Sequence, residues 1–420
     1  MLFSSGMANK KHRWKQAVQW LYIVVVIGII VGSASALFLA LLDFVGTFRK
    51  QQPIFHYALP VFGIFIVWMY SKLSTTNGNQ LIQSAYFDSS NDVIKKRVPL
   101  LLTPLVFIGT LLTHLGGGSA GREGTAVQMG ASIASQFNRW FKLNETEQRL
   151  VIAVGVSAGF AGVFGTPLAA SVFAFEFFGL RKTKWYFIFP SLLVAYLADF
   201  ICIRWGIHHA QYKILIFNNF DFVTLGWVSV AGVLFGLAAF LFVQSSVLFT
   251  NLTGQIKSPF LRAFIGGVLI VTFVLSTGQE KMAGLGLPVI EKAFIYPQAS
   301  FDFLIKLLLT SFTLSVGFKG GEVTPLFFIG AVLGSALIAI LPLPISLLAG
   351  LGLVAVFAGA THCVLTAILL GIELYGLEFT IYITLACGLA YLFAGNKSIY
   401  EDRPKGWIKK TIASYFLYTM

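Results

Sequence analysis

Apolar runs separated by short polar breaks fill almost the whole chain. Residues 17–48 and 222–249 are helix-length and rich in Leu, Ile, Val and Phe, without the alternation of polar and apolar positions that marks a strand. A helix of about 20 apolar residues spans the ~30 Å hydrocarbon core of a bilayer. The pattern therefore predicts an all-α integral membrane protein, with the long first run as a tilted helix.

Other apolar runs are short or interrupted. Residues 151–164 and 167–179 are separated by Gly165-Thr166-Pro167. At 1.5 Å per residue, neither run comfortably crosses ~30 Å alone. The sequence predicts broken helices as well as complete spans.

Composition supports placement in a bilayer. The chain is 57% hydrophobic and 11% charged, whereas a soluble domain has about 25% charged residues. Three cysteines, Cys202, Cys363 and Cys387, are scattered through apolar sequence, with neither metal-ligand spacing nor a disulfide framework. We expect no bound metal and no cofactor.

The net charge of +13 does not indicate a nucleic-acid partner, because the basic residues gather at the two ends and in loops. Positive flanks mark the cytoplasmic side of a membrane, so both termini are expected in the cytoplasm. These terminal basic residues are Lys10, Lys11, Arg13, Lys15, Arg403, Lys405, Lys409 and Lys410.

An unusual polar stretch interrupts the apolar pattern at residues 115–125, LGGGSAGREGT, which places five glycines, Arg122 and Glu123 between two apolar runs. A charged side chain at membrane depth is costly and persists mainly where it lines a cavity or an ion path. Glycines let backbone N–H groups approach a ligand, and the following run can begin a helix facing the same point. The stretch predicts an anion site that contains an acid.

The second half of the chain repeats the first. Gly117, Gly121, Gly130 and Ala131 have counterparts exactly 200 residues later. A further set, Gly155, Gly162, Leu168, Ala170 and Glu176, matches Gly352, Gly359, Leu365, Ala367 and Glu373 at a separation of 197. Their common order favours duplication over chance.

The repeat divides the chain. We expect a cytoplasmic segment at 1–16, membrane repeats at 17–210 and 211–400, and a cytoplasmic-side helix at 401–420. In inverted-repeat transporters, broken helices from both halves direct their N-termini to an anion at the membrane midplane. The matching pair here is GREGT at 121–125 and GEVTP at 321–325.

These motifs resemble those of the CLC chloride channels and transporters. GREG at 121–124 is close to the GREGP signature of that family, with Thr125 replacing the proline. FGTPLA at 164–169 resembles the segment that leads to the family's dimer-facing helix, and Tyr400 resembles its terminal pore tyrosine. The resemblance covers the chain from its first helix to Tyr400 and implies the CLC-type inverted repeat and a homodimer.

Three departures resemble the fluoride/proton antiporter branch. GNQLI at 78–82 places Asn79 where chloride-selective members carry a serine, and GEVTP at 321–325 replaces GxFxP and adds Glu322. Phe177 stands where proton-coupled chloride members have an inner glutamate. The resemblance implies a bacterial inner-membrane exporter that exchanges fluoride for protons and supports fluoride resistance.

Glu123 has the chemistry for such exchange. An ionised carboxylate among backbone N–H groups competes with an anion, and burial favours its neutral form, so the same group can carry a proton. The alternative to a transport role is that Glu123 only forms a salt bridge with Arg122. We set this aside because adjacent side chains usually point apart. Gly121, Arg122, Gly124 and Val323 complete the expected anion site.

Other candidates have weaker individual support. Glu322 can bind a proton or fluoride, or it can pair with Lys319 and only hold the broken helix. Asn79 and Thr324 offer the hard hydrogen-bond donors that must replace fluoride's water, although polar residues also cap helices. Tyr400 is a candidate from the resemblance alone. Glu176 and Glu373 are expected to have structural roles at helix or subunit contacts.

Three rival functions remain. A chloride/proton antiporter or a passive anion channel would use the same fold, and no CBS-type regulatory domain is expected after Tyr400. Gly117-Gly118-Ser119-Ala120-Gly121 also matches G-x-S-x-G, the motif of a serine hydrolase. That motif requires a strand-to-helix turn and a base, which an all-helical pattern does not imply, and we expect a transporter rather than an enzyme.

Overall fold

The computed structural model describes residues 7–71, 77–87, 97–179, 185–214 and 221–400. The expected helix at 401–420 and residues 1–6 of the expected N-terminal segment lie outside these ranges. Regular structure in the described residues is helical, apart from one antiparallel bridge between Gly121 and Gly321.

Helices of the first half surround the glycine stretch of residues 116–121. They are α1 (Met7–Gln51), η1 (Pro53–Ala58), α2 (Leu59–Tyr70), α3 (Gly78–Phe87), α4 (Leu102–Leu115), α5 (Glu123–Ser135), α6 (Phe137–Phe141), α7 (Glu145–Phe164), α8 (Pro167–Phe178), η2 (Trp185–Phe187) and α9 (Ile188–Arg204).

Helices of the second half follow the same order. They are α10 (Phe222–Gly254), α11 (Pro259–Thr277), η3 (Glu280–Met282), α12 (Leu287–Ala293), α13 (Asp302–Ser315), α14 (Val323–Ala336), η4 (Leu337–Ala339), α15 (Ile345–Thr361), α16 (Val364–Tyr375), η5 (Leu377–Phe379) and α17 (Thr380–Phe393).

The two halves keep one register. α2 and α11 begin 200 residues apart, α4 and α13 begin and end 200 apart, and α5 and α14 begin 200 apart (323 − 123 = 200). α8 and α16 begin 197 apart (364 − 167 = 197), the second separation found in the sequence. The helical order of the first half is thus repeated in the second.

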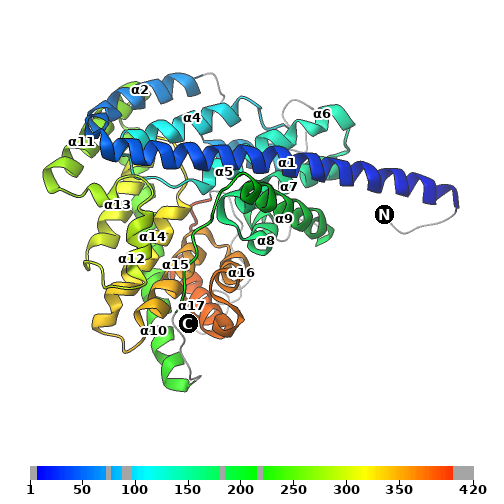
Figure 1. Cartoon of the computed structure of the whole chain (residues 1–420). Helices are drawn as coiled ribbons and strands as arrows, with labels where there is room; N and C mark the ends of the chain where they lie inside the picture. The colour runs from blue at the N-terminus through cyan, green and yellow to red at the C-terminus, as the bar shows by residue number, and fades with distance from the viewer. Residues whose placement is uncertain (1–6, 72–76, 88–96, 180–184, 215–220, 401–420) are drawn as a thin grey trace, which may run out of the picture.

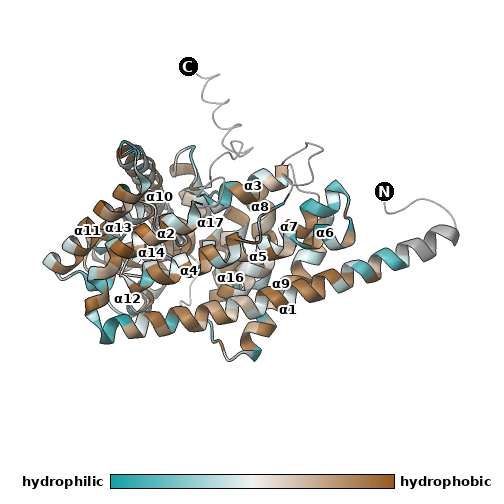
Figure 2. Cartoon of the chain, turned by 90° about the horizontal axis from the view of Figure 1, so that it is seen from above, coloured by the Kyte–Doolittle hydropathy of each residue, from teal (hydrophilic) through white to brown (hydrophobic). Residues whose placement is uncertain are grey.

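Lipid-facing character is visible on the outer helices. α1 crosses the molecule and its first turns extend beyond the other helices (Figure 1). Apolar residues cover much of the outer helical surface (Figure 2), including the exposed side chains of Leu21, Leu241 and Leu269. Five described helical segments are long and apolar enough to cross a membrane, so the chain is a multi-pass membrane protein in its fold.

One expectation about helix length is wrong. The run at 151–164 belongs to α7, which begins at Glu145 and has 20 residues. Its polar first turn conceals the true start, where the Asn144 side chain accepts from the Glu147 N–H and Glu147 accepts from the Asn144 N–H. In contrast, α8 has only 12 residues and is short, as expected.

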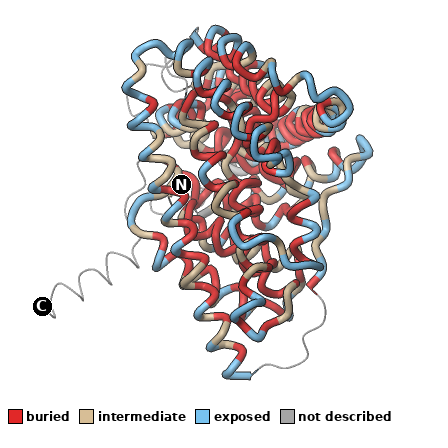
Figure 3. Tube along the Cα trace, turned by 90° about the vertical axis from the view of Figure 1, so that its left-hand side faces the viewer, coloured by how far each residue is buried: buried red, intermediate tan, exposed pale blue. Residues whose placement is uncertain are grey.

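The core is built on close helix packing at the repeated glycines. A Cβ atom at Gly130 of α5 would overlap the Gly155 carbonyl of α7, and one at Gly330 of α14 would overlap the Gly352 carbonyl of α15. The buried residues form a continuous interior through the middle of the molecule (Figure 3). These glycines let the backbones touch and so fix the positions of α5 and α14.

Two carboxylates join the halves at helix N-termini. Glu176, near the end of α8, accepts from the Leu365 N–H (3.0 Å) and Thr366 N–H (2.7 Å) of α16. Glu373, near the end of α16, accepts from the Leu168 N–H (2.9 Å) and Ala169 N–H (2.8 Å) of α8. The structural roles expected of both glutamates at helix contacts are confirmed.

Gly330→Ala tests the glycine packing. The added methyl meets backbone atoms that have no rotamer with which to move away, so we expect a loss of about 1–3 kcal/mol in the free energy of unfolding. Gly388→Ala on α17 is the control, because a Cβ there meets nothing within 4 Å. Thermal unfolding of the two detergent-solubilised variants measures the effect, and equal midpoints would contradict this account of the packing.

Candidate functional site

The N-termini of α5 and α14 meet at the centre of the molecule. The Gly121 N–H donates to the Gly321 carbonyl (2.5 Å), and the Gly321 N–H donates to the Gly121 carbonyl (2.8 Å). A Cβ at Gly320 would touch the Cβ of Ala120, and its φ of +153° is unusual for any other residue. The two glycine-rich segments that precede α5 and α14 can therefore lie side by side.

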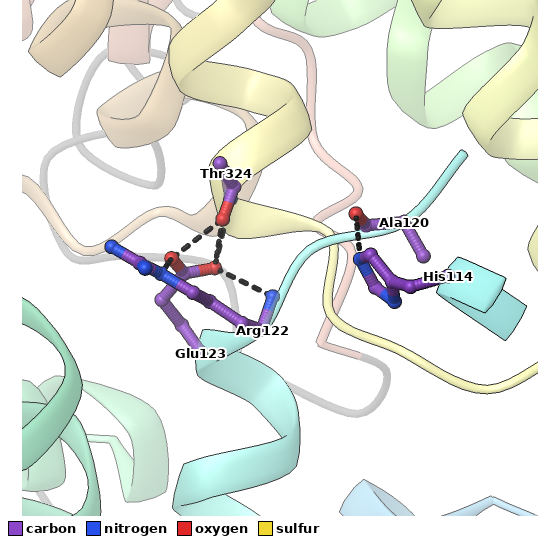
Figure 4. Close-up of polar contacts among 5 residues, drawn as sticks. All are labelled: His114, Ala120, Arg122, Glu123 and Thr324. Carbon is purple, nitrogen blue, oxygen red and sulfur yellow. Dashed lines mark hydrogen bonds and ion pairs between the residues drawn. The ribbon is translucent and has the colours of Figure 1, made fainter. Parts of the chain in front are cut away.

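Glu123 is the first residue of α5, and its carboxylate lies at the N-terminus of α14 (Figure 4). The Thr324 hydroxyl is 2.5 Å from both carboxylate oxygens, and the Thr324 N–H donates to Oε2 at 3.0 Å. The Glu123 side chain is 1% exposed. A helix N-terminus favours negative charge through its free N–H groups and dipole. The carboxylate occupies a place suited to an anion.

Arg122 also contacts this carboxylate. Its N–H donates to Glu123 Oε2 at 3.2 Å, and its Nε lies 3.4 Å from Oε1. The expectation that the two adjacent side chains point apart is wrong. Arg122 is the N-cap of α5 and precedes Glu123 directly, yet both side chains turn toward the same point. The ion pair neutralises part of the buried charge, while Thr324 supplies the hydrogen bonds from the other half.

A second layer of polar contacts fixes the glycine-rich strand before Glu123. His114 ring nitrogens lie 2.8 Å from the Thr110 carbonyl and 3.1 Å from the Ala120 carbonyl (Figure 4). Ser119 Oγ lies 2.8 Å from Thr310 Oγ1 and is fully buried. A hydroxyl whose partner is another hydroxyl lacks the base that a serine nucleophile requires, so Ser119 has a structural contact here.

A very small cavity of about 10 Å³ lies beside Glu123. That volume is close to the minimum for a single water molecule. The cavity is lined by Asn79, Glu123, Gly124, Val127, Gln128, Phe160, Phe173, Phe177, Gly320, Gly321, Glu322, Val323 and Tyr400. With the carboxylate in place, the site is almost filled.

Most of the candidates from the sequence meet at this cavity. Six of them line it, from four separate parts of the chain: Asn79, Glu123, Gly124, Glu322, Val323 and Tyr400. Gly121, Arg122 and Thr324 are not in the wall, but the last two bond to Glu123 and Gly121 joins the two halves. Lys319, which the sequence suggested as a partner for Glu322, places its ammonium 4.3 Å from the centre of the Tyr70 ring.

Asn79 has a partner that the sequence did not reveal. The Gln128 side-chain N–H donates to Asn79 Oδ1 at 3.0 Å, which leaves the Asn79 NH₂ group available as a donor. Gln128 lies on α5, five residues after Glu123, and its polar side chain in an apolar run was the available signal. Asn77 caps α3 through bonds from the Asn79 and Gln80 N–H groups, which holds Asn79 at the cavity.

Aromatic rings close the wall opposite the α14 N-terminus. Phe177 and Phe173 of α8 pack edge-on to Tyr400, with ring centres 5.0 and 6.1 Å apart. Tyr400 is 5% exposed. Phe177 is part of the cavity wall. In the sequence it stands at the position where proton-coupled chloride members of the resembled family have an inner glutamate.

The groups at this site are hydrogen-bond donors and carboxylates. Among the described residues, no group of three or more His, Cys, Asp or Glu side chains is placed to hold a metal ion. The described cysteines at 202, 363 and 387 are buried and unbridged. Helix N-termini, hydroxyl and amide donors and one movable carboxylate are the groups present.

Comparisons with known proteins show the family to which the chain belongs. Residues 62–395 match the family described as voltage gated chloride channel. A chloride/fluoride channel protein of Pseudomonas syringae pv. tomato is 40% identical over 404 residues, covering 93% of this chain and 87% of that protein.

Two solved structures have the same architecture. A CLC-type fluoride/proton antiporter superposes with a TM-score of 0.87 and 32% identity, over 95% of this chain and 99% of that one. A slow cyanobacterial Cl⁻/H⁺ antiporter superposes with a TM-score of 0.78 over 95% and 98% of the two chains. At 22% identity, the second similarity concerns the fold alone.

Thr324→Val tests the bond between the two halves at Glu123. Loss of a hydroxyl that donates to a buried charge is expected to cost about 1.5–3 kcal/mol of stability. Thr324→Ser retains the hydroxyl and is the control. Combining each variant with Glu123→Gln in a double-mutant cycle isolates the coupling between the two side chains. Equal stability losses for Val and Ser would show that the hydroxyl contributes nothing.

Proposed function

Because this chain belongs to the voltage gated chloride channel family, we propose that it is a fluoride/proton antiporter that exports fluoride in exchange for protons. The observation that carries the proposal is the Glu123 carboxylate held at the N-terminus of α14 by both donors of Thr324. An anion/proton exchanger needs a carboxylate that can occupy the anion site when it is ionised and leave the site when it is protonated.

The exchange follows from competition for one place. While Glu123 is ionised, its oxygens accept the Thr324 bonds and exclude a free anion. On protonation the carboxyl loses its charge and much of the strength of these bonds, because charge-assisted hydrogen bonds are roughly twice as strong as neutral ones. The side chain can then leave, and an anion can accept from the same donors. Proton and anion are thereby coupled through one residue.

Fluoride fits the donors around this place. It is small and strongly hydrated, so a site must replace its water with short hydrogen bonds. The Thr324 hydroxyl and N–H, the free NH₂ of Asn79 and the Tyr400 hydroxyl are the proposed donors. The backbone at Gly121, Gly124 and Val323 and the positive charge of Arg122 complete the anion-binding region.

Glu322 is proposed as a second acid in the pathway. It is the N-cap of α14 and lines the same cavity as Glu123. The opposite helix has Arg122 at the corresponding place, so the two halves differ in charge at their N-caps. A carboxyl at this position can bind a proton as Glu123 releases one.

The cellular setting is part of the proposal. We propose a bacterial inner membrane with both termini cytoplasmic, a homodimer with one ion path in each subunit, and a role in fluoride resistance. The repeats at 17–210 and 211–400 form that path together, since Glu123 comes from one and Thr324 from the other. Protons, fluoride and the bilayer are the proposed partners, without nucleic acid, metal or cofactor.

A passive anion channel is the second candidate. The 40% identical relative is named a chloride/fluoride channel protein, whereas the structure at 32% identity is described as a fluoride/proton antiporter. A channel would move fluoride without protons, and a chloride/proton antiporter would move both anions. Transport in a defined membrane distinguishes all three.

The test uses purified protein in liposomes, with fluoride efflux and internal pH recorded together. We expect fluoride efflux coupled to proton uptake and much slower chloride efflux from vesicles with an equal chloride gradient. In Glu123→Gln, proton movement should fall to background and fluoride turnover should decrease, because the amide cannot exchange a proton. Glu145→Gln, on an exposed part of α7, is the control.

Normal proton movement in Glu123→Gln would remove Glu123 from its assigned role. Anion flux without protons in the wild-type protein would establish a channel. Comparable proton-coupled chloride and fluoride fluxes would establish a less selective exchanger.

Asn79→Ser tests anion selectivity. Loss of the amide donor is expected to reduce the preference for fluoride over chloride by about tenfold, which corresponds to ~1.4 kcal/mol. Asn77→Ser is the matched control, because Asn77 caps the same helix without lining the cavity. The ratio of initial efflux rates in liposomes gives the selectivity, and an unchanged ratio in Asn79→Ser would exclude the amide as a determinant.

A further inference from the structure

A second, much larger cavity opens beyond the start of α8. Its volume is about 740 Å³. Its wall contains the turn between α7 and α8, the end of α9, the linker at 207–213 and the end of α16. His208, Gln211 and Lys213 in this wall are exposed, so the cavity communicates with the surface.

This outer cavity and the small cavity beside Glu123 lie at opposite ends of α8. Thr166, directly before α8, lines the outer cavity, whereas Phe177 in the last turn lines the small one. A helix of 12 residues separates its ends by about 18 Å. The proposed function puts both termini in the cytoplasm, so we place the small cavity, which Tyr400 lines, toward the cytoplasmic end of α8 and the outer cavity toward the opposite side of the membrane.

An acid and a base face each other in the outer cavity. His209 Nε2 is 3.2 Å from Asp199 Oδ1, with side chains 13% and 16% exposed. Neither atom has a hydrogen-bond partner among the described residues. When the imidazole carries a proton, the two side chains form an ion pair in the wall of the cavity. The imidazole also packs against Gly165, where φ of +69° and the absence of a Cβ leave room for it.

The surrounding charges are few. Asp199 comes from α9 and Glu373 from α16, while His208 and Lys213 lie on the same linker as His209. The turn between α7 and α8 contributes no charged group to the wall, but Thr166 Oγ1 is buried there without a partner. Since Glu373 is bound to the α8 N-terminus, Asp199 is the carboxylate that pairs with His209.

The outer cavity reaches close to Glu123. Tyr212 in its wall is partly buried, which raises the pKa of the phenol to about 12, and it lies near enough to Arg122 and Glu123 to be affected by their charges. Phe164, also in the wall, packs on Phe160 with ring centres 4.5 Å apart, and Phe160 lines the small cavity. Two aromatic side chains therefore bridge the walls of the two cavities.

We propose that the outer cavity is a proton-loading site in which His209, held by Asp199, collects protons from the outer solution and supplies them to Glu123. The imidazolium releases its proton on the side of the cavity where Tyr212 lies and returns to neutral imidazole, and the Glu123 carboxylate accepts the proton. This inference rests on the proposed exchange of fluoride and protons, and it assigns to that exchange a group that sets its dependence on external pH.

The test measures coupled fluoride efflux from liposomes at fixed internal pH, with external pH varied over about 5.5–8, the range in which an imidazole titrates. The wild-type rate is expected to rise with a distinct midpoint as external pH falls. In His209→Gln that midpoint should disappear, while the number of protons moved per fluoride stays unchanged because Glu123 is intact. His208→Gln, on the neighbouring residue in the same wall, should behave as the wild type.

Asp199→Asn separates proton loading from a structural role. Asp199→Asn removes the carboxylate charge beside His209, so the dependence of the rate on external pH should differ from that of the wild type. A defect in folding alone would reduce the rate by the same factor at every pH. Size-exclusion chromatography of the variants checks that they remain folded.

A wild-type midpoint in His209→Gln would overturn the inference and leave the exchange itself intact. So would a uniform loss of rate in both variants, or an equal change in His208→Gln. Wild-type vesicles that move fluoride without protons would instead overturn the proposed function and this inference with it.

Discussion

Helix N-termini inside the protein need acceptors for their free N–H groups, and this requirement organises the structure. Water at membrane depth cannot be relied on to supply them, and an unsatisfied group costs several kcal/mol. The chain supplies carboxylates from the opposite half: Glu123 for α14, Glu176 for α16 and Glu373 for α8. Each broken helix is therefore completed by a residue about 200 positions away in sequence.

These three carboxylates differ in what surrounds them. Glu176 and Glu373 form a reciprocal pair between α8 and α16, and each stabilises a fixed contact. Glu123 has no reciprocal partner, because the matching residue in the second half is Val323. It also lies beside a cavity and an arginine. At this pair of helix N-termini the two halves of the duplicated fold differ, and the difference lies in the candidate transport site.

Much of the fold could be predicted from residues with a clear physical demand. Gly130 and Gly155, with their counterparts 200 and 197 residues later, indicated the repeat, and the structure shows that no larger residue fits between the paired backbones. Asn79, Glu123 and Tyr400 were expected to meet, and they line one cavity. Charge and glycine at membrane depth are rare enough to be informative in one sequence.

Other features depend on geometry that residue patterns do not encode. The Arg122–Glu123 ion pair depends on the side-chain conformations at the start of α5, and the Gln128–Asn79 bond depends on how α3 packs against α5. The start of α7 was missed because its first turn is polar. The outer cavity joins three segments that are far apart in sequence, and its His209–Asp199 pair shows no motif.

The separation of 201 residues between Glu123 and Thr324 also has a consequence for biosynthesis. A ribosome adds about 5–20 residues per second, so Glu123 emerges roughly 10–40 seconds before its partner does. During that interval the first half lacks its partners from the second half. The Glu123 carboxylate has no Thr324 donor, and the Gly121 N–H has no Gly321 carbonyl. Assembly of the two halves ends that interval, because Thr324 then supplies the hydrogen bonds to Glu123.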